Sequence, residues 1–144
     1  GTLQVSNQLG DDVVELADNI MFADQAASIS SWICMSDYAD NNNDVLVRFT
    51  KALMKAKDYR SNPANAEEIS GWIADKCGLD QATVYDQRGD AEWLSSDDMM
   101  KEINDGTIEK LYKSQQQGFI NAGDVEAEVP VSDYVLFDVM KAAK

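Results

Sequence analysis

The chain has 144 residues, about the length of one domain, and 44% of them are hydrophobic, which is typical of a globular protein. Its 26 acidic and 12 basic residues give a net charge of −14, which repels a phosphate backbone and argues against nucleic acid as a partner. No run of about 18 consecutive apolar residues is present, and the first residues lack the pattern of a signal peptide. Neither a membrane span nor a signal peptide is visible in these residues, and the compartment stays open, because a mature exported protein no longer carries its signal.

Two short strands are predicted near the start of the chain, within residues 19–36. Residues 20–23 and 29–35 are apolar runs that contain β-branched and aromatic side chains and are bounded by turn formers. Around the second run lie four candidate ligand contacts, three serine hydroxyls and an indole ring at the mouth of the strand. They are Ser28, Ser30, Ser31 and Trp32. The alternative, which is the more common arrangement, is a buried core tryptophan beside a surface turn of serines.

Three aspartates and three asparagines crowd into residues 37–44, which raises the question of a calcium loop. Such a loop needs glycine at position 6 and a bidentate acid at position 12. Counting from Asp40 puts Val45 at position 6 and a lysine at position 12, and counting from the first aspartate puts an alanine at position 3. The sequence predicts instead that Asn43 or Asp44 caps a helix and that no metal binds.

Helical spacing of apolar residues predicts helices from residue 43 onward. The first is long, with Phe49 and Leu53 on its apolar stripe. The second has Pro63 in its first turn and ends at Gly78, which is expected to adopt the left-handed conformation.

Three further helical stretches follow in the second half of the chain. Asp80 is the predicted cap of a short third helix. Ser95 opens a fourth stretch, which Gly106 is expected to break and Gly118 to end. Ser132 is the predicted cap of a last short helix. With no repeat and no linker between these elements, we predict a single unit over residues 1–144.

The residue types present argue against catalysis. The chain has no histidine, which excludes Ser/His and Cys/His dyads and histidine-ligated metals, and it lacks the usual nucleotide, acyl-transfer and redox motifs. We expect no catalytic residue, no cofactor and no metal site, and we expect that the protein is not an enzyme. Cys34 and Cys77 are expected to be small buried side chains, with a disulfide as the alternative.

The order of motifs from residue 19 to the end resembles a known family. The motifs are "NIMFAD", "SSWICMSDYADNN", "DVLVRFTKALMKAKDYRSNPANAEEISGWIADKCGLDQATV" and "GFINAGDVEAEVPVSDYVLFDVMKAA". In this order they resemble the C-terminal portion of the substrate-binding proteins of ABC importers, in the nitrate/sulfonate/taurine and thiamine-precursor (NMT1/THI5-like) group. One departure is Asn43 with Asp44, where the family commonly has Asn-Pro.

The resemblance implies both a fold and a function. The implied fold is α/β and mostly helical, the C-terminal part of a two-lobed periplasmic-binding-protein (type II-like) fold with a few short strands. The implied function is a solute-binding component located outside the cytoplasm, in the periplasm or as a lipoprotein. It would bind a small anion or a thiamine-precursor-like molecule and deliver it to an ABC permease, with the ligand held by residues 28–32.

A second interpretation comes from another class of protein. A small acidic helical module that binds a protein partner, without a small-molecule ligand, is the alternative. If the chain is a fragment, its apolar face normally packs on an absent part, so self-association of the fragment is expected.

Overall fold

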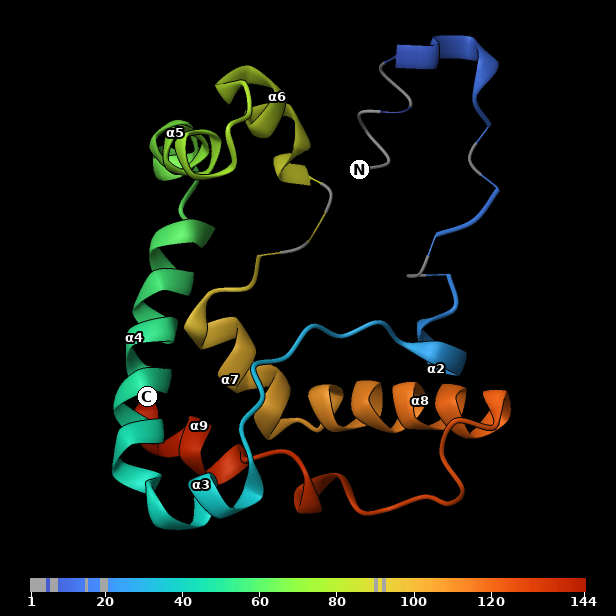
Figure 1. Ribbon diagram of the computed structural model, residues 1–144, viewed down its shortest axis with the longest axis vertical. Helices are drawn as coiled ribbons and strands as arrows, with labels where there is room; N and C mark the ends of the chain where they lie inside the picture. The colour runs from blue at the N-terminus through green and yellow to red at the C-terminus, as the bar shows by residue number, and fades with distance from the viewer. Residues whose placement is uncertain (1–4, 6–7, 15, 19–20, 90, 92) are drawn as a thin grey trace. The chain divides into compact units, whose positions relative to one another are not determined.

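The computed structural model describes residues 5, 8–14, 16–18, 21–89, 91 and 93–144 (Figure 1). The chain divides into two compact units. The first unit comprises Gly1–Leu16 and Lys55–Ser96, and the second comprises Ala17–Met54 and Asp97–Lys144. The prediction of a single unit over residues 1–144 stays a prediction.

The predicted α/β fold class is wrong, because all regular secondary structure in the described residues is helical. Residues 28–35 run extended, as the sequence suggests, but no backbone-to-backbone hydrogen bond joins residues 28–34 to any other residue that the structure describes. The first predicted strand fails differently. Its described part is a turn followed by α2 (Ala23–Ala26), while Ile20 lies outside the described residues. The type II-like fold with its strands is therefore corrected to a helical one.

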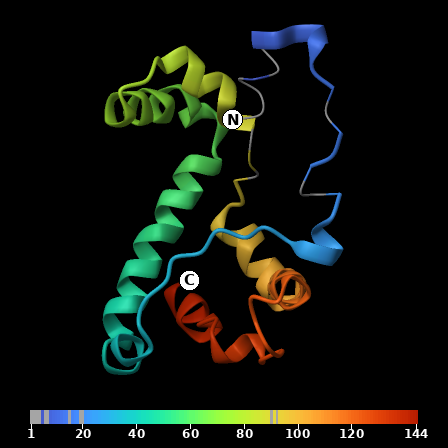
Figure 2. The ribbon, with the colours of Figure 1, turned by 45° about the vertical axis from the view of Figure 1, so that its right-hand side comes forward.

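The first unit holds the C-terminal part of α4 (Asn43–Ser61) and the elements that follow it. These are η2 (Pro63–Asn65), α5 (Ala66–Cys77), α6 (Gln81–Asp86) and η3 (Gln87–Gly89), with η1 (Gly10–Asp12) from the N-terminal segment. Helices α5 and α6 pack together (Figures 1 and 2). Gly78 ends α5 at φ 65°, and the Asp80 carboxylate accepts the Thr83 N–H at 3.0 Å. These ends confirm the boundaries predicted at Gly78 and Asp80, whereas Pro63 lies in η2 and α5 begins at Ala66, so the predicted place of Pro63 in the first turn of that helix is wrong.

The second unit contains the extended segment and most of the other helices. They are α2, α3 (Ser36–Asn41), the first part of α4, α7 (Ser96–Asn104) from its second residue, α8 (Thr107–Ala122), η4 (Val131–Asp133) and α9 (Phe137–Ala143). Helix α2 lies along α8 (Figures 1 and 2). Buried apolar residues of this unit are Ala27, Met54, Val131, Val135, Val139 and Ala143. Within the described residues, no helix is both long and apolar enough to cross a bilayer.

The ends of α8 correct one prediction and confirm another. Gly106 at φ 82° separates α7 from α8, as predicted, because glycine enters the left-handed region without a Cβ penalty. Gly118 lies inside α8, so the predicted terminator is wrong, and Gly123 at φ 83° ends the helix. Ser132 lies within η4 and α9 begins at Phe137, so the predicted cap at Ser132 is wrong as well.

Helix α4 begins at residue 43 as predicted, but its N-terminus is held differently. Asn42, and not Asn43 or Asp44, precedes the helix, and its carbonyl oxygen accepts the first backbone N–H groups. Its side-chain Nδ2 donates to the carbonyl oxygen of Tyr38 at 3.0 Å, which ties the end of α3 to the start of α4. The Asp44 carboxylate pairs with Arg48 at 3.0 Å.

The two cysteines are free and exposed. The expectation that they are small buried side chains is therefore wrong. Cys34 lies on the extended segment of the second unit, and Cys77 is the last residue of α5 in the first unit.

Candidate functional site

The residues predicted to contact a ligand lie together on the extended segment between α2 and α3. Ser28, Ser30, Ser31 and Trp32 are all exposed, and 78% of the Trp32 surface is accessible. The expectation of a core tryptophan, the alternative raised from the sequence, does not describe this position. The segment carries no charged side chain from Gln25 to Ser36, so any ligand contact there rests on hydrogen bonds and aromatic surface.

Side chains of α8 hold the extended segment in place of a neighbouring strand. The Ala27 N–H donates to Ser114 Oγ at 3.1 Å, and the Ser114 hydroxyl donates to the carbonyl oxygen of Ala23 at 2.5 Å. Further along, Gln115 Nε2 donates to the carbonyl oxygen of Ile29 at 3.4 Å. One face of α8 thus satisfies backbone groups that a sheet would otherwise pair.

A chain of hydroxyls and aromatic rings extends from the predicted site across α8. Ser31 Oγ and the Tyr112 hydroxyl lie 2.6 Å apart, and the Tyr112 ring meets the Tyr134 ring edge-on with centroids 6.0 Å apart. On the other side of Ser31, the Trp32 ring packs edge-on against Phe49 with centroids 5.7 Å apart. The structure therefore brings Ser31 and Trp32 into a wider cluster, whereas Ser28 and Ser30 make no such contact with the residues that the structure describes.

Gln116 joins this cluster to the loop that precedes η4. Its amide is buried, at 8% exposure, and Oε1 accepts the Val129 N–H at 2.6 Å. Nε2 donates to the Val129 carbonyl oxygen at 3.1 Å and to the Tyr134 hydroxyl at 3.0 Å. Sequence analysis missed Gln116, Tyr112 and Tyr134, because their partners come from other parts of the chain and no local pattern marks them.

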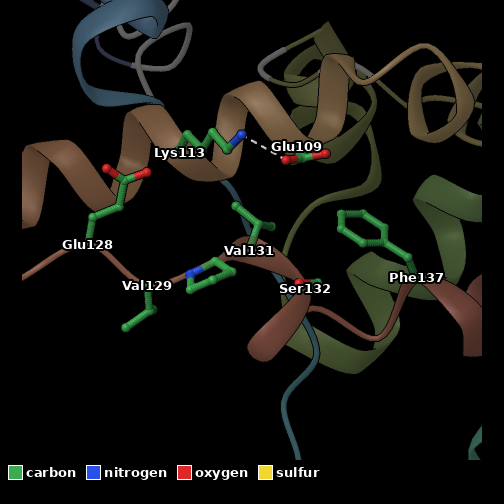
Figure 3. Close-up of a pocket in the computed structure, with 8 residues that line it drawn as sticks. Glu109, Lys113, Glu128, Val129, Val131, Ser132 and Phe137 are labelled. Atoms are coloured by element: carbon green, nitrogen blue, oxygen red, sulfur yellow. Dashed lines mark ion pairs between the residues drawn. The ribbon is translucent and has the colours of Figure 1, made fainter.

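An open hollow of about 510 Å³ lies where this loop faces α8 (Figure 3). Its lining residues come from α8, the loop, η4 and the start of α9. They are Glu109, Lys113, Glu128, Val129, Pro130, Val131, Ser132 and Phe137. The volume is in the range of small-molecule sites, and the lining combines an apolar floor with three charged side chains.

Two carboxylates and one ammonium group line the hollow, and only one of the carboxylates forms an ion pair with the ammonium group. Lys113 Nζ lies 2.8 Å from Glu109 Oε1. The hydrogen bond to Glu109 and its negative charge hold the pKa of Lys113 above the ordinary value, and the charge of Glu128 adds to this effect. The ammonium group is thus engaged by one carboxylate, which leaves the hollow with a net negative charge at neutral pH.

The first unit has an aromatic cluster of its own. The Tyr59 and Trp72 rings stack with centroids 5.8 Å apart, and the Tyr59 hydroxyl donates to Glu68. That hydrogen bond raises the pKa of Tyr59. The Arg60 guanidinium lies 3.4 Å from the centroid of the Trp93 ring, a cation–π contact. These contacts join α4 to α5 and to the loop before α7, which is a structural role.

Potential metal ligands do not cluster in the described residues. In the part of the chain that the structure describes, no three His, Cys, Asp or Glu side chains gather where they could hold an ion. The hydroxyls and aromatic rings around Ser31, Trp32 and Tyr112 offer hydrogen bonds and stacking surface to an organic molecule.

Comparison with known proteins finds relatives among bacterial binding proteins. The chain is 24% identical over 130 residues to proteins named "Putative binding protein" from Brucella abortus, Brucella suis and Brucella melitensis. The match covers 90% of this chain and 40% of each relative. The chain therefore spans less than half the length of these relatives. No family model matches the chain, and no solved structure gives a significant match.

Proposed function

We propose that this chain belongs to the solute-binding component of an ABC importer, which works outside the cytoplasm and delivers a small molecule to a membrane permease. The observation that carries the proposal is the similarity to the Brucella proteins over nine-tenths of the chain. The motif order from residue 19 onward supports the same assignment. The chain spans 40% of the length of those relatives, so the activity of a whole importer component is part of the proposal.

The ligand contacts belong to the extended segment and α8. Ser31 and the Tyr112 hydroxyl supply paired donors and acceptors, and the exposed Trp32 ring supplies a flat apolar surface. Ser28 and Ser30 flank them on the same segment. Between a small anion and a thiamine-precursor-like ring, this neutral set favours the ring, which stacks on indole and needs no cation to balance a charge. The proposal includes no catalytic step, and Ser31 acts as a hydrogen-bonding group.

Tryptophan fluorescence tests the ligand site directly. The protein is titrated with a hydroxymethylpyrimidine, taurine and nitrate, and the emission is recorded for wild type, Trp32→Phe and Trp72→Phe. Trp72 is a matched control, because it is also exposed but lies in the first unit. We expect a saturable change with the pyrimidine that survives in Trp72→Phe and disappears in Trp32→Phe.

Calorimetric titration with the same three solutes supplies the outcome that contradicts the proposal. If no solute binds while circular dichroism shows a folded chain, residues 28–32 do not form a solute site. A response lost in Trp72→Phe and kept in Trp32→Phe moves the site to the first unit.

Protein–protein interaction is the second candidate function, and one observation favours it. Ile33 and Met35, which follow Trp32 on the extended segment, are 92% and 74% exposed. Exposed apolar residues gathered on one segment mark interaction surfaces in soluble proteins. Under this alternative the segment contacts another protein chain, including a second copy of this one, and the solute titration gives no signal.

A further inference from the structure

The hollow in front of α8 is separate from the residues proposed to hold the importer's solute. Figure 3 shows Glu109 and Lys113 on α8, with Val129 and Val131 on the opposite wall. The Phe137 ring closes one end, and Glu128 stands near the other. None of these residues belongs to the extended segment at 28–35. The hollow is therefore a second place in the same unit where a small molecule can be held.

Its charges point to the sign of the ligand. Glu109 and Glu128 carry two negative charges, and Lys113 carries one positive charge that is already paired with Glu109 at 2.8 Å. Among the residues that the structure describes, no cation lies within ion-pairing distance of Glu128. An anion entering the hollow would have to displace Glu109 from Lys113, whereas a cation meets a carboxylate without a close partner.

The apolar lining points to the rest of the ligand. The apolar residues that line the hollow beside the carboxylates are Val129, Pro130, Val131 and Phe137. Val131 is almost fully buried, at 2% exposure, so it supports the wall from inside, and two hydrogen bonds with the Gln116 amide hold the backbone of Val129 in position. A ligand that covers the wall needs an apolar body next to its charge.

We propose that the hollow binds a small organic cation with an apolar body, of the alkylammonium class. The apolar body lies on Val129, Pro130 and Phe137, and the ammonium group pairs with Glu128. The net charge of −14 raises the local concentration of cations around the whole chain and favours the same ligand sign.

Calorimetric titration with three probes of equal chain length tests the proposal. The probes are hexylammonium, 1-hexanesulfonate and 1-hexanol, which present a cation, an anion and a neutral group on the same apolar body. We expect saturable binding of hexylammonium and at least several-fold weaker binding of the other two. Equal binding of hexanol would show that the hollow binds the apolar chain without selecting a charge. Preferential binding of the sulfonate would show that Lys113, and not Glu128, pairs with the ligand. Either result overturns the proposal.

Glu128→Gln removes the negative charge that the proposal uses, and Glu126→Gln is its matched control. Both residues are exposed on the same loop, but only Glu128 lines the hollow. We expect Glu128→Gln to weaken hexylammonium binding about three- to fivefold, the range of a solvent-accessible charge pair, and Glu126→Gln to change it less than about twofold. Equal effects of the two variants would show general attraction to an acidic surface and would contradict a site.

The test is independent of the importer proposal. Trp32→Phe is expected to leave hexylammonium affinity unchanged, because Trp32 does not line the hollow. Loss of hexylammonium binding in Trp32→Phe would mean that the amine sits at the extended segment, and the hollow would then not be its site.

Discussion

At the scale of single residues, the buried amide of Gln116 does most to shape the candidate sites. Its Oε1 accepts the Val129 N–H, and its Nε2 donates to the Val129 carbonyl oxygen and to the Tyr134 hydroxyl. The oxygen and the nitrogen of this buried amide therefore both have hydrogen-bond partners. Nothing in the sequence distinguishes it from Gln115 and Gln117 on either side. Its role depends on partners 13 and 18 residues away, which helical periodicity does not reveal.

Gln116→Ala is expected to lower the free energy of unfolding by about 1–3 kcal/mol, because it leaves the N–H and carbonyl of Val129 and the Tyr134 hydroxyl without their partner. Gln117→Ala is the matched control. Gln117 is exposed and bonds only to Asn121 within the described residues of α8, so its loss is expected to cost less than about 0.5 kcal/mol. Urea unfolding measures both values. Equal costs would show that the Gln116 network does not hold the loop.

Asp105, just before α8, provides a prediction on pH. The hydroxyl and backbone N–H of Thr107 donate to its carboxylate and hold the pKa of Asp105 below the ordinary 3.8. Since the folded-state pKa is the lower one, the carboxylate stabilises the fold at pH above the unfolded-state value. This contribution is lost as pH falls through the folded-state pKa.

NMR titration of the Asp105 carboxyl group measures this effect. We expect a midpoint below 3.8 in the wild type and a return toward 3.8 in Thr107→Ala, which removes the hydroxyl donor. A wild-type midpoint at or above 3.8 would mean that Thr107 does not donate to Asp105 in solution.

At the scale of elements, sequence and structure agree at the helix ends that local signals set. Gly78 and Asp80 act on backbone groups within a few residues of themselves, so their roles follow from the sequence alone. Gly118 was misassigned as a terminator because a glycine inside a helix and one that ends it look alike in sequence. Residues 29–35 were misassigned because a strand also requires a distant partner, and side chains of α8 take that place.

Replacement by alanine is expected to have opposite effects at Gly71, inside α5, and at Gly78, which follows its last residue. Gly71 lies inside the helix, and the nearest atoms to a Cβ there belong to the flexible Gln81 side chain, at 3.4 Å, so Gly71→Ala is expected to stabilise by about 0.5–1 kcal/mol. Gly78 ends the helix at φ 65°, where a Cβ meets no atom within 4 Å but the backbone conformation is strained. Gly78→Ala is expected to destabilise by about 1 kcal/mol.

Thermal unfolding of the two variants checks these signs, since both changes add one methyl group to the same helix. A destabilising Gly71→Ala together with a neutral Gly78→Ala would place the end of α5 elsewhere.

The start of α7 shows how non-local contacts add to such local signals. The Asp58 carboxylate accepts the Ser96 N–H at 2.7 Å and the Ser96 hydroxyl at 2.8 Å across 38 residues, a contact that the predicted cap at Ser95 did not foresee.

At the scale of the whole molecule, strong net charge and local exposed apolar surface act against each other. A net charge of −14 keeps copies of the chain apart, yet Trp32, Ile33 and Met35 form an exposed apolar segment without a charge among them. The hollow was not predictable from the sequence, because its walls come from α8 and from a loop whose position depends on Gln116. The serine and tryptophan segment was predictable, because its composition alone marks it.

Self-association through this segment is expected to depend on salt. At low ionic strength the charges repel, and at about 1 M salt the Debye length falls to roughly 3 Å, so that repulsion no longer opposes apolar contact. Light scattering is expected to give a higher average mass at high salt than at low salt. Ile33→Ser is expected to remove most of this increase, whereas Leu79→Ser, at a 53% exposed position of the first unit, is expected to leave it unchanged. A mass that stays monomeric at high salt and high protein concentration would contradict self-association. An increase that Leu79→Ser abolishes and Ile33→Ser does not would place the contact on the first unit, away from the extended segment.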